Sequence, residues 1–144
     1  MRSKLLESRF WSSIEAIIAA NLSIVKGGAL KFVIKWRNTG NVSRRFSVQA
    51  SWGKGTTYAA FTWAGALPPV IATLAAGAQV TTTSPAYTVG AGFATGTWDV
   101  LYGIWDDEVV SGPPLAYVIH ANELTITEPI AMSAEIISAS IAVA

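Results

Sequence analysis

The sequence predicts an all-β protein folded as an antiparallel β-sandwich. From residue 17 onward, apolar and polar residues alternate strictly over most of the chain, which is the pattern of half-buried strands. Turn signals rich in Gly, Asn and Pro separate about seven such stretches at regular spacing. The exception is the N-terminal segment, where a short leader helix is expected over Leu5 to Phe10.

Length and composition fit a single domain with few charges. The chain has 144 residues, of which 51% are hydrophobic and only 13% are charged, against a usual charged share of roughly 25%. The surface is therefore expected to carry Thr, Ser, Gly, Ala and aromatic groups, or to be buried by partners. A net charge of +1 predicts no nucleic-acid binding.

Two further classes are excluded on composition. The chain has no Cys, so disulfides, thiolate metal sites and thiol nucleophiles are absent. No apolar run approaches the roughly 18 residues that a membrane-spanning helix needs, so no membrane span is expected.

The first half of the chain gives the clearest strands. The first is expected over 17–24, followed by a turn at 26–28, a strand over 30–37, a turn at 38–41 and a strand over 45–52. The residues expected to face inward are Ile18, Ala20, Leu22 and Ile24, then Leu30, Phe32, Ile34 and Trp36, then Phe46, Val48, Ala50 and Trp52.

The second half is less regular. A strand is expected over 57–63, then a loop past Pro68 and Pro69, then strands beginning near Gln79 and covering 96–106 and 113–127. The alternation shifts phase near Ala121 and Asn122, which predicts a β-bulge in the last strand. Large core anchors are expected from Trp36, Trp52, Trp98 and one of Trp63 or Trp105.

Three stretches carry a resemblance to a known family. They are "LKFVIKWRNTGNVSRRFSVQASW", the Leu-x-x-Gly turn of "LAAGAQVTTT", and "GTWDVLYGIWDD". Together they resemble the immunoglobulin-like modules of the CARDB type found in bacterial, archaeal and phage surface proteins, over roughly residues 16 to 127. The resemblance implies an immunoglobulin-like sandwich with an adhesion, spacer or decoration role and no shared catalytic residues.

The segments outside this module are expected to make contacts. We divide the chain into a leader (1–15), a sandwich (16–128) and a C-terminal arm (129–144). The leader is expected to dock through Leu5, Leu6, Phe10 and Trp11. A secretory signal is the alternative, but polar residues from Glu7 to Glu15 interrupt the apolar run that it would need.

No catalytic, cofactor-binding or metal-binding residues are assigned. The single histidine, His120, lies within a predicted strand and is expected to be a packed or surface residue. Asp106, Asp107 and Glu108 lack the spacing of a calcium loop and are expected at an acidic hairpin tip. The adjacent Arg44 and Arg45 are expected to begin a strand rather than to form a phosphate site.

Trp63 and Trp105 are the candidates for a ligand platform. Trp105 has the opposite phase to Ile104, which is expected to face inward. Exposed tryptophans on a sandwich bind sugars in carbohydrate-binding modules, so these two residues define the alternative function of a carbohydrate-binding surface module.

The arm repeats the pattern of the first strand. "IISASIAV" (136–143) matches "IIAANLSI" (17–24) at Ile136, Ile137 and Ala139, with Ile141 and Val143 conservative. It has the pattern of the first strand of a second module. Burying its inward side chains gives roughly 5–8 kcal/mol, while ordering eight residues costs roughly 8–16 kcal/mol. The arm therefore needs a receiving sheet edge, in its own domain or in a neighbouring copy.

These features predict a non-enzymatic structural subunit. The expected partners are copies of itself and other virion or filament proteins, and no cofactor is expected. The low charge content favours a virion, as a phage tail or capsid-decoration protein. The alternative is an extracellular, pilus-like filament joined by donor strands at the cell surface.

Overall fold

The all-β prediction is confirmed. The structure is a computed structural model that describes residues 12–17, 22–108, 112–130, 134 and 140–143. Every regular element in this part of the chain is a β-strand. No helix within the described ranges is long and apolar enough to cross a membrane. The leader helix expected over residues 5–10 lies outside the described residues.

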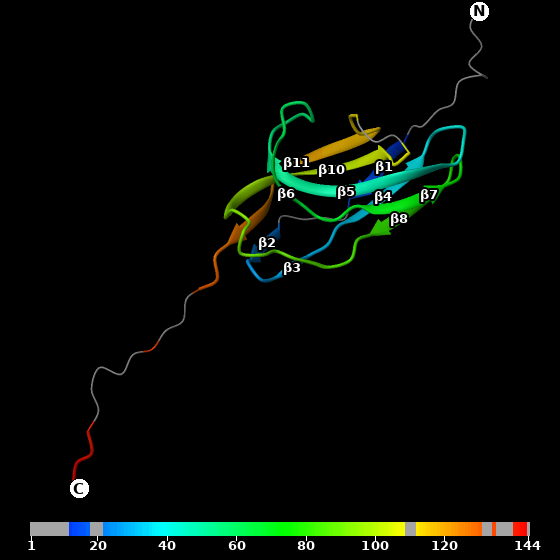
Figure 1. Ribbon diagram of the computed structural model, residues 1–144. Coiled ribbons are helices and arrows are strands. Elements are labelled where there is room, and N and C mark those ends of the chain that lie inside the picture. The colour runs from blue at the N-terminus through cyan, green and yellow to red at the C-terminus, as the bar shows by residue number, and fades with distance from the viewer. Residues whose placement is uncertain (1–11, 18–21, 109–111, 131–133, 135–139, 144) are drawn as a thin grey trace, which may run out of the picture.

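The strands form three hydrogen-bonded sheets, and the two larger sheets are the layers of a sandwich (Figure 1). The large sheet has the order β2-β11-β10-β5-β6, with β7 also paired to β5, and the smaller sheet has the order β1-β4-β8. The short strands β3 and β9 form a separate pair. The strands are β1 (Ser12–Ile17), β2 (Leu22–Val25), β3 (Ala29–Leu30), β4 (Val33–Asn38), β5 (Arg44–Lys54), β6 (Thr62–Ala66), β7 (Val70–Leu74), β8 (Gln79–Thr83), β9 (Tyr87–Thr88), β10 (Gly96–Asp106) and β11 (Ala116–Thr127).

The core lies between the two main layers and uses the predicted inward faces of β4 and β5, whereas Leu22, which was also expected to face inward, is 47% exposed. Trp36 is 0% exposed and contacts Phe46 edge-to-face, with the ring centroids 5.1 Å apart. Its indole N–H donates to Thr82 Oγ1 at 2.8 Å. Trp52 is also buried, whereas Trp98 is half-buried and packs against the core from its margin. The core residues are Leu30, Phe32, Ile34, Trp36, Phe46, Val48, Ala50, Trp52, Leu67, Val89, Val100, Tyr102, Ile104, Leu124 and Ile126.

The prediction of one continuous first strand over 17–24 is wrong. β1 pairs antiparallel with β4 in the smaller sheet, whereas β2 pairs parallel with β11 in the large sheet. Alternation along the chain does not reveal which sheet a strand joins, because both sheets bury one face against the same core. Residues 12–15, assigned to the leader, lie in β1.

The prediction of a strand over 57–63 is also wrong. Residues 57–60 form a turn, β6 begins only at Thr62, and β7 follows directly after Pro69 where a loop was expected. β6 and β7 pair with different parts of β5. Pro68 and Pro69 lie between β6 and β7, where the chain passes from one part of β5 to the other. Proline is tolerated there because residues between two strands do not have to donate a backbone hydrogen bond to the sheet.

The predicted bulge in the last strand is confirmed. Trp98 lies opposite Leu124 while Val100 lies opposite His120, so β11 has extra residues at this point of the ladder. Asn122 has a φ of 52°, a left-handed conformation that Asn tolerates better than most residues. The bulge positions the backbone of Asn122 and the side chain of Glu123 for the contacts described below.

Candidate functional site

The outer face of the large sheet is partly covered by a second layer of side chains. Leu101 points away from the core, because its neighbours Val100 and Tyr102 point into it, yet Leu101 is 0% exposed. The chain between β5 and β6 folds back over this face, and Phe61 in that segment is only 6% exposed. Strict alternation predicts a polar outer face here, so this second apolar layer was missed.

Five aromatic residues from four parts of the chain meet on this face. The Tyr58 ring lies 5.9 Å from Trp63, 6.4 Å from Trp105 and 6.0 Å from Tyr117, measured between centroids. The Phe61 and Trp63 rings are 4.8 Å apart. The outer aromatic cluster consists of Tyr58, Phe61, Trp63, Trp105 and Tyr117. The structure thus brings together Trp63 and Trp105, the two predicted platform residues, through Tyr58.

Glycines make room for these rings on the sheet. A Cβ at Gly103 would lie 2.5 Å from two ring atoms of Trp105, so the indole lies across the bare backbone of β10. A Cβ at Gly53 would lie 2.9 Å from the Phe61 ring. Because glycine has no side chain, both rings approach the sheet more closely than any other residue would permit.

Asp99 holds the loop that carries Tyr58. Its Oδ2 accepts a hydrogen bond from the Gly55 N–H at 3.0 Å, and its Oδ1 accepts one from the Asn122 N–H at 2.9 Å. These two backbone bonds, first that from Asn122 and then that from Gly55, lower the pKa of the Asp99 carboxyl. The carboxylate therefore joins the β5–β6 loop to the bulge of β11.

We expect Asp99→Asn to lower the free energy of unfolding at pH 7 by about 1–2 kcal/mol, because one backbone N–H would then face an amide donor. The folded pKa of Asp99 lies below its unfolded value of about 3.9. Its contribution is therefore complete above about pH 4 and is lost as the pH falls through the folded pKa. Denaturant titrations at several pH values should show the difference between variant and parent shrinking below about pH 4.

Asp107→Asn is the matched control for this prediction. Asp107 pairs with Arg45, whose side chain is 51% exposed, and such surface pairs contribute about 0–1 kcal/mol. An Asp99→Asn variant as stable as the parent at pH 7 would contradict the anchoring role.

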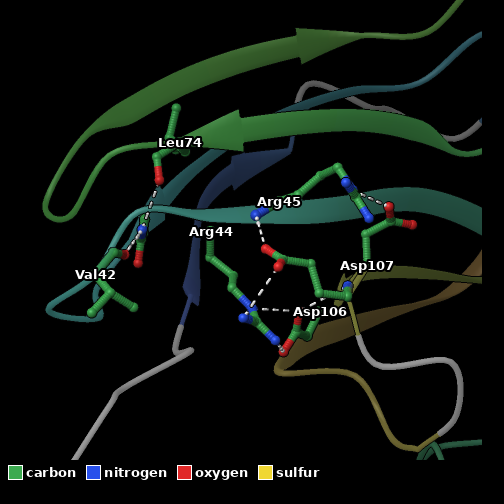
Figure 2. A network of polar contacts seen from close by, with 8 residues as sticks. Val42, Arg44, Arg45, Leu74, Asp106 and Asp107 are labelled. Carbon is green, nitrogen blue, oxygen red and sulfur yellow. Dashed lines mark hydrogen bonds and ion pairs between the residues drawn. The ribbon is translucent and has the colours of Figure 1, made fainter.

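The two sequence clusters of opposite charge form one ion-pair network (Figure 2). Arg44 Nε and a terminal guanidinium nitrogen donate to the two oxygens of Asp106 at 3.0 and 3.1 Å. Arg44 also pairs with Glu108 at 3.3 Å, and Arg45 pairs with Asp107 at 2.6 Å. The hydrogen bond to Asp106 is the main cause that raises the pKa of Arg44.

This network accounts for both charged motifs without a ligand. Arg44 begins β5 as predicted, two residues before Phe46, which lies opposite Asp106 at the end of β10. The carboxylates of Asp106, Asp107 and Glu108 therefore receive arginine partners. Among the residues that the structure describes, no group of three or more His, Asp or Glu side chains could hold a metal ion.

A buried acidic residue, Glu123, lies beside His120 and was not predicted from the sequence. Glu123 is 6% exposed. Its Oε2 accepts a hydrogen bond from the Tyr102 hydroxyl at 2.7 Å, and its Oε1 lies 2.9 Å from His120 Nδ1. Burial, followed by the hydrogen bond to Glu123, raises the pKa of Tyr102 far above its usual value. His120 is thus half-buried and paired with Glu123. The shift of phase in the sequence near Asn122 was the signal that could have indicated that Glu123 is buried.

The arm is described at residues 129, 130, 134 and 140–143. Ile141 and Val143 are fully exposed, Ile130 is 88% exposed, and residues 140–143 form no strand. Figure 1 shows these coloured parts of the arm extending away from the sandwich. Ile136, Ile137 and Ala139, and the docking residues Leu5, Leu6, Phe10 and Trp11, lie outside the described residues.

Comparison with known proteins gives likeness in fold. No protein-family model matches the chain, and no curated protein matches it. A Niemann-Pick type C2 protein from the Japanese carpenter ant superposes with a TM-score of 0.52 at 10% identity, over 85% of this chain and 96% of that one. A β-glucosidase from Listeria innocua in complex with glucose gives 0.50 at 14% identity, over 82% of this chain but 16% of the enzyme.

A third structure is the CARDB domain of a Pyrococcus furiosus protein in complex with di-metal ions. It has a TM-score of 0.46 at 11% identity, over 88% of this chain and 99% of that domain. At 10% and 14% identity, the first two similarities concern the fold alone. The strand pairing forms the all-β sandwich expected from the sequence.

Proposed function

We propose that the chain is a non-enzymatic structural subunit that associates with copies of itself through the C-terminal arm, residues 129–144. The observation that carries this proposal is the exposure of Ile130, Ile141 and Val143, at 88%, 102% and 101% of their reference surface. A segment whose described residues are exposed, outside any strand and mostly apolar is a template for pairing with another sheet.

The counterpart of the arm within the sandwich supports this role. By the sequence match, Ile141 and Val143 correspond to Leu22 and Ile24. In the structure, these two residues belong to β2, which lies along β11 at the edge of the large sheet. A segment with this pattern is therefore of a kind that the edge of this sheet accepts.

Part of β11 has no hydrogen-bonded neighbour on one side among the described strands, although β1 of the smaller sheet also packs against β11. β11 pairs with β10 from Ala116 to Ile126, but β2 covers its other side only from Leu124 to Thr127. In the part of the chain that the structure describes, no strand pairs with residues 116–123 of β11 on the side away from β10. Main-chain hydrogen bonds to this stretch would supply the stabilisation that side-chain burial alone does not give.

The composition supports a setting in which many copies pack together. Charged residues make up 13% of the chain, so much of its surface can be buried against neighbours at little cost in desolvation. A virion, with the chain as a phage tail or capsid-decoration protein, is the setting that we favour. An extracellular filament joined by donor strands is the alternative, and other virion or filament proteins are the further partners.

The alternation of the arm provides a test with a matched control. We expect Ile141→Asp with Val143→Asp to weaken self-association more than about 100-fold, since two side chains worth about 1.5–3 kcal/mol each would be replaced by charges. Ser140→Asp with Ala142→Asp adds the same charge on the opposite face of the strand and should leave association within about tenfold of the parent. Analytical ultracentrifugation over a concentration series measures both.

The two double variants distinguish strand addition from nonspecific hydrophobic association. Equal losses in both would mean that charge, rather than one buried face, weakens association. An unchanged association in the Ile141 and Val143 variant would remove the arm from the interface.

A further inference from the structure

The outer aromatic cluster presents two exposed ring surfaces side by side. Trp63 is 49% exposed and Tyr117 is 43% exposed, and both contact Tyr58, which lies between them. Phe61 and Trp105 support these rings from the sheet, Phe61 buried and Trp105 half-buried. Neither Trp63 nor Tyr117 belongs to the hydrophobic core between the sheets.

The size of this surface limits what it can bind. A fully buried aromatic side chain covers about 150–250 Å², so the exposed halves of Trp63 and Tyr117 offer roughly 200 Å². A stable interface between two proteins needs about 800 Å² on each partner. The two exposed rings alone are smaller than such an interface and comparable with the face of one or two sugar rings.

The chemistry of the surface also matches a sugar. Pyranose rings present a flat face of C–H groups that packs on electron-rich aromatic rings, and their hydroxyl groups need polar partners at the edge. The loop before Trp63 supplies exposed threonines at Thr56 and Thr57, of which Thr57 also accepts a hydrogen bond from the Ala60 N–H. Tilted rings of the kind seen here, at 72° between Tyr58 and Trp63 and 50° between Tyr58 and Tyr117, offer faces in more than one direction.

The cluster is held in place before any ligand arrives. Asp99 fixes the start of the β5–β6 loop through Gly55, and the Phe61 N–H donates to the Tyr58 carbonyl at 3.2 Å within the turn. The Ala60 N–H donates to Thr57 Oγ1 at 3.2 Å. A preformed surface loses little entropy on binding, which favours a small ligand with few contacts.

We infer that the outer aromatic cluster is a carbohydrate-binding site that takes a neutral pyranose ring on Trp63, Tyr58 and Tyr117. This site uses the outer face of the sheet. Tyr117 belongs to the stretch of β11 whose edge is proposed for the arm, but strand addition uses its main chain, whereas the sugar uses its ring. The chain would then display a sugar-binding surface on each copy of the assembly, and many weak sites on one particle would act together.

The test uses the full chain and a panel of neutral oligosaccharides of glucose, mannose, galactose and N-acetylglucosamine, with binding followed by isothermal titration calorimetry and tryptophan fluorescence. We expect at least one sugar to bind in the micromolar to millimolar range, and Trp63→Ala and Tyr117→Ala each to weaken it by about tenfold or more. Thermal unfolding of each variant, measured in parallel, confirms that the sandwich remains folded.

Ile71→Ala is the matched control. Ile71 is 48% exposed and lies opposite Ser47 of β5, so it offers a comparable apolar surface on the same face without a ring. Binding in this variant should equal that of the parent. No binding by any sugar at up to about 10 mM would overturn the proposal, as would equal weakening by Ile71→Ala. Deleting residues 130–144 should leave sugar binding unchanged, which separates this site from the proposed assembly.

Discussion

Replacing Trp36 by alanine is expected to lower the free energy of unfolding by about 3–5 kcal/mol, the range for large aromatic residues lost from a core. Trp36 is 0% exposed and joins both layers, through its hydrogen bond to Thr82 on β8 and its ring contact with Phe46 on β5. The cavity left behind would lie between the sheets, where the surrounding strands are too constrained to close it.

A loss of this size is a large part of the stability of an ordinary domain, which is about 5–15 kcal/mol. We expect a decrease in Tm of about 10–20 °C in thermal unfolding followed by circular dichroism. Trp63→Ala is the control, because it makes the same chemical change at a residue that is 49% exposed and should cost about 1 kcal/mol. Equal losses in the two variants would contradict the placement of Trp36 at the centre of the sandwich.

The parts of the fold that the sequence predicts best are strands with one buried face. Around Trp36 and Trp52, the alternation of large apolar and polar residues corresponds directly to the two faces of β4 and β5. The bulge near Asn122 could also be predicted, because an extra residue in a strand shifts the phase of the alternation on either side of it.

The errors arise where pairing, rather than local pattern, decides the structure. The first predicted strand splits because β1 and β2 join different sheets, and no local signal marks that change. β7 was missed because Pro68 and Pro69 indicate a loop, although they lead directly into a strand that shares β5 with β6.

The candidate site was predicted only in part, because strand pairing and loop contacts, rather than local pattern, bring its residues together. Trp105 was identified from its phase. Tyr58 lies in a turn and therefore has no phase, and Tyr117 lies opposite Gly103 on a face that was expected to be polar. Arg44 and Asp106 are 62 residues apart. Only the register of β5 against β10 brings them together, so their pairing could not be inferred from the sequence.

The central claim is that the arm joins one copy of the chain to another. Ile130, Ile141 and Val143 are exposed, and residues 128–130 and 140–143 form no strand with the sandwich, so removing residues 130–144 should leave the fold and its Tm nearly unchanged. Strand addition buries several apolar side chains and makes a row of main-chain hydrogen bonds, so its loss should abolish assembly.

The most direct test is the mass in solution of the full chain and of the chain lacking residues 130–144, measured by light scattering and electron microscopy at equal concentrations. We predict that the full chain forms particles or filaments of many copies, whereas the shortened chain is a folded monomer. Identical masses for the two, either both monomeric or both assembled, would contradict the account.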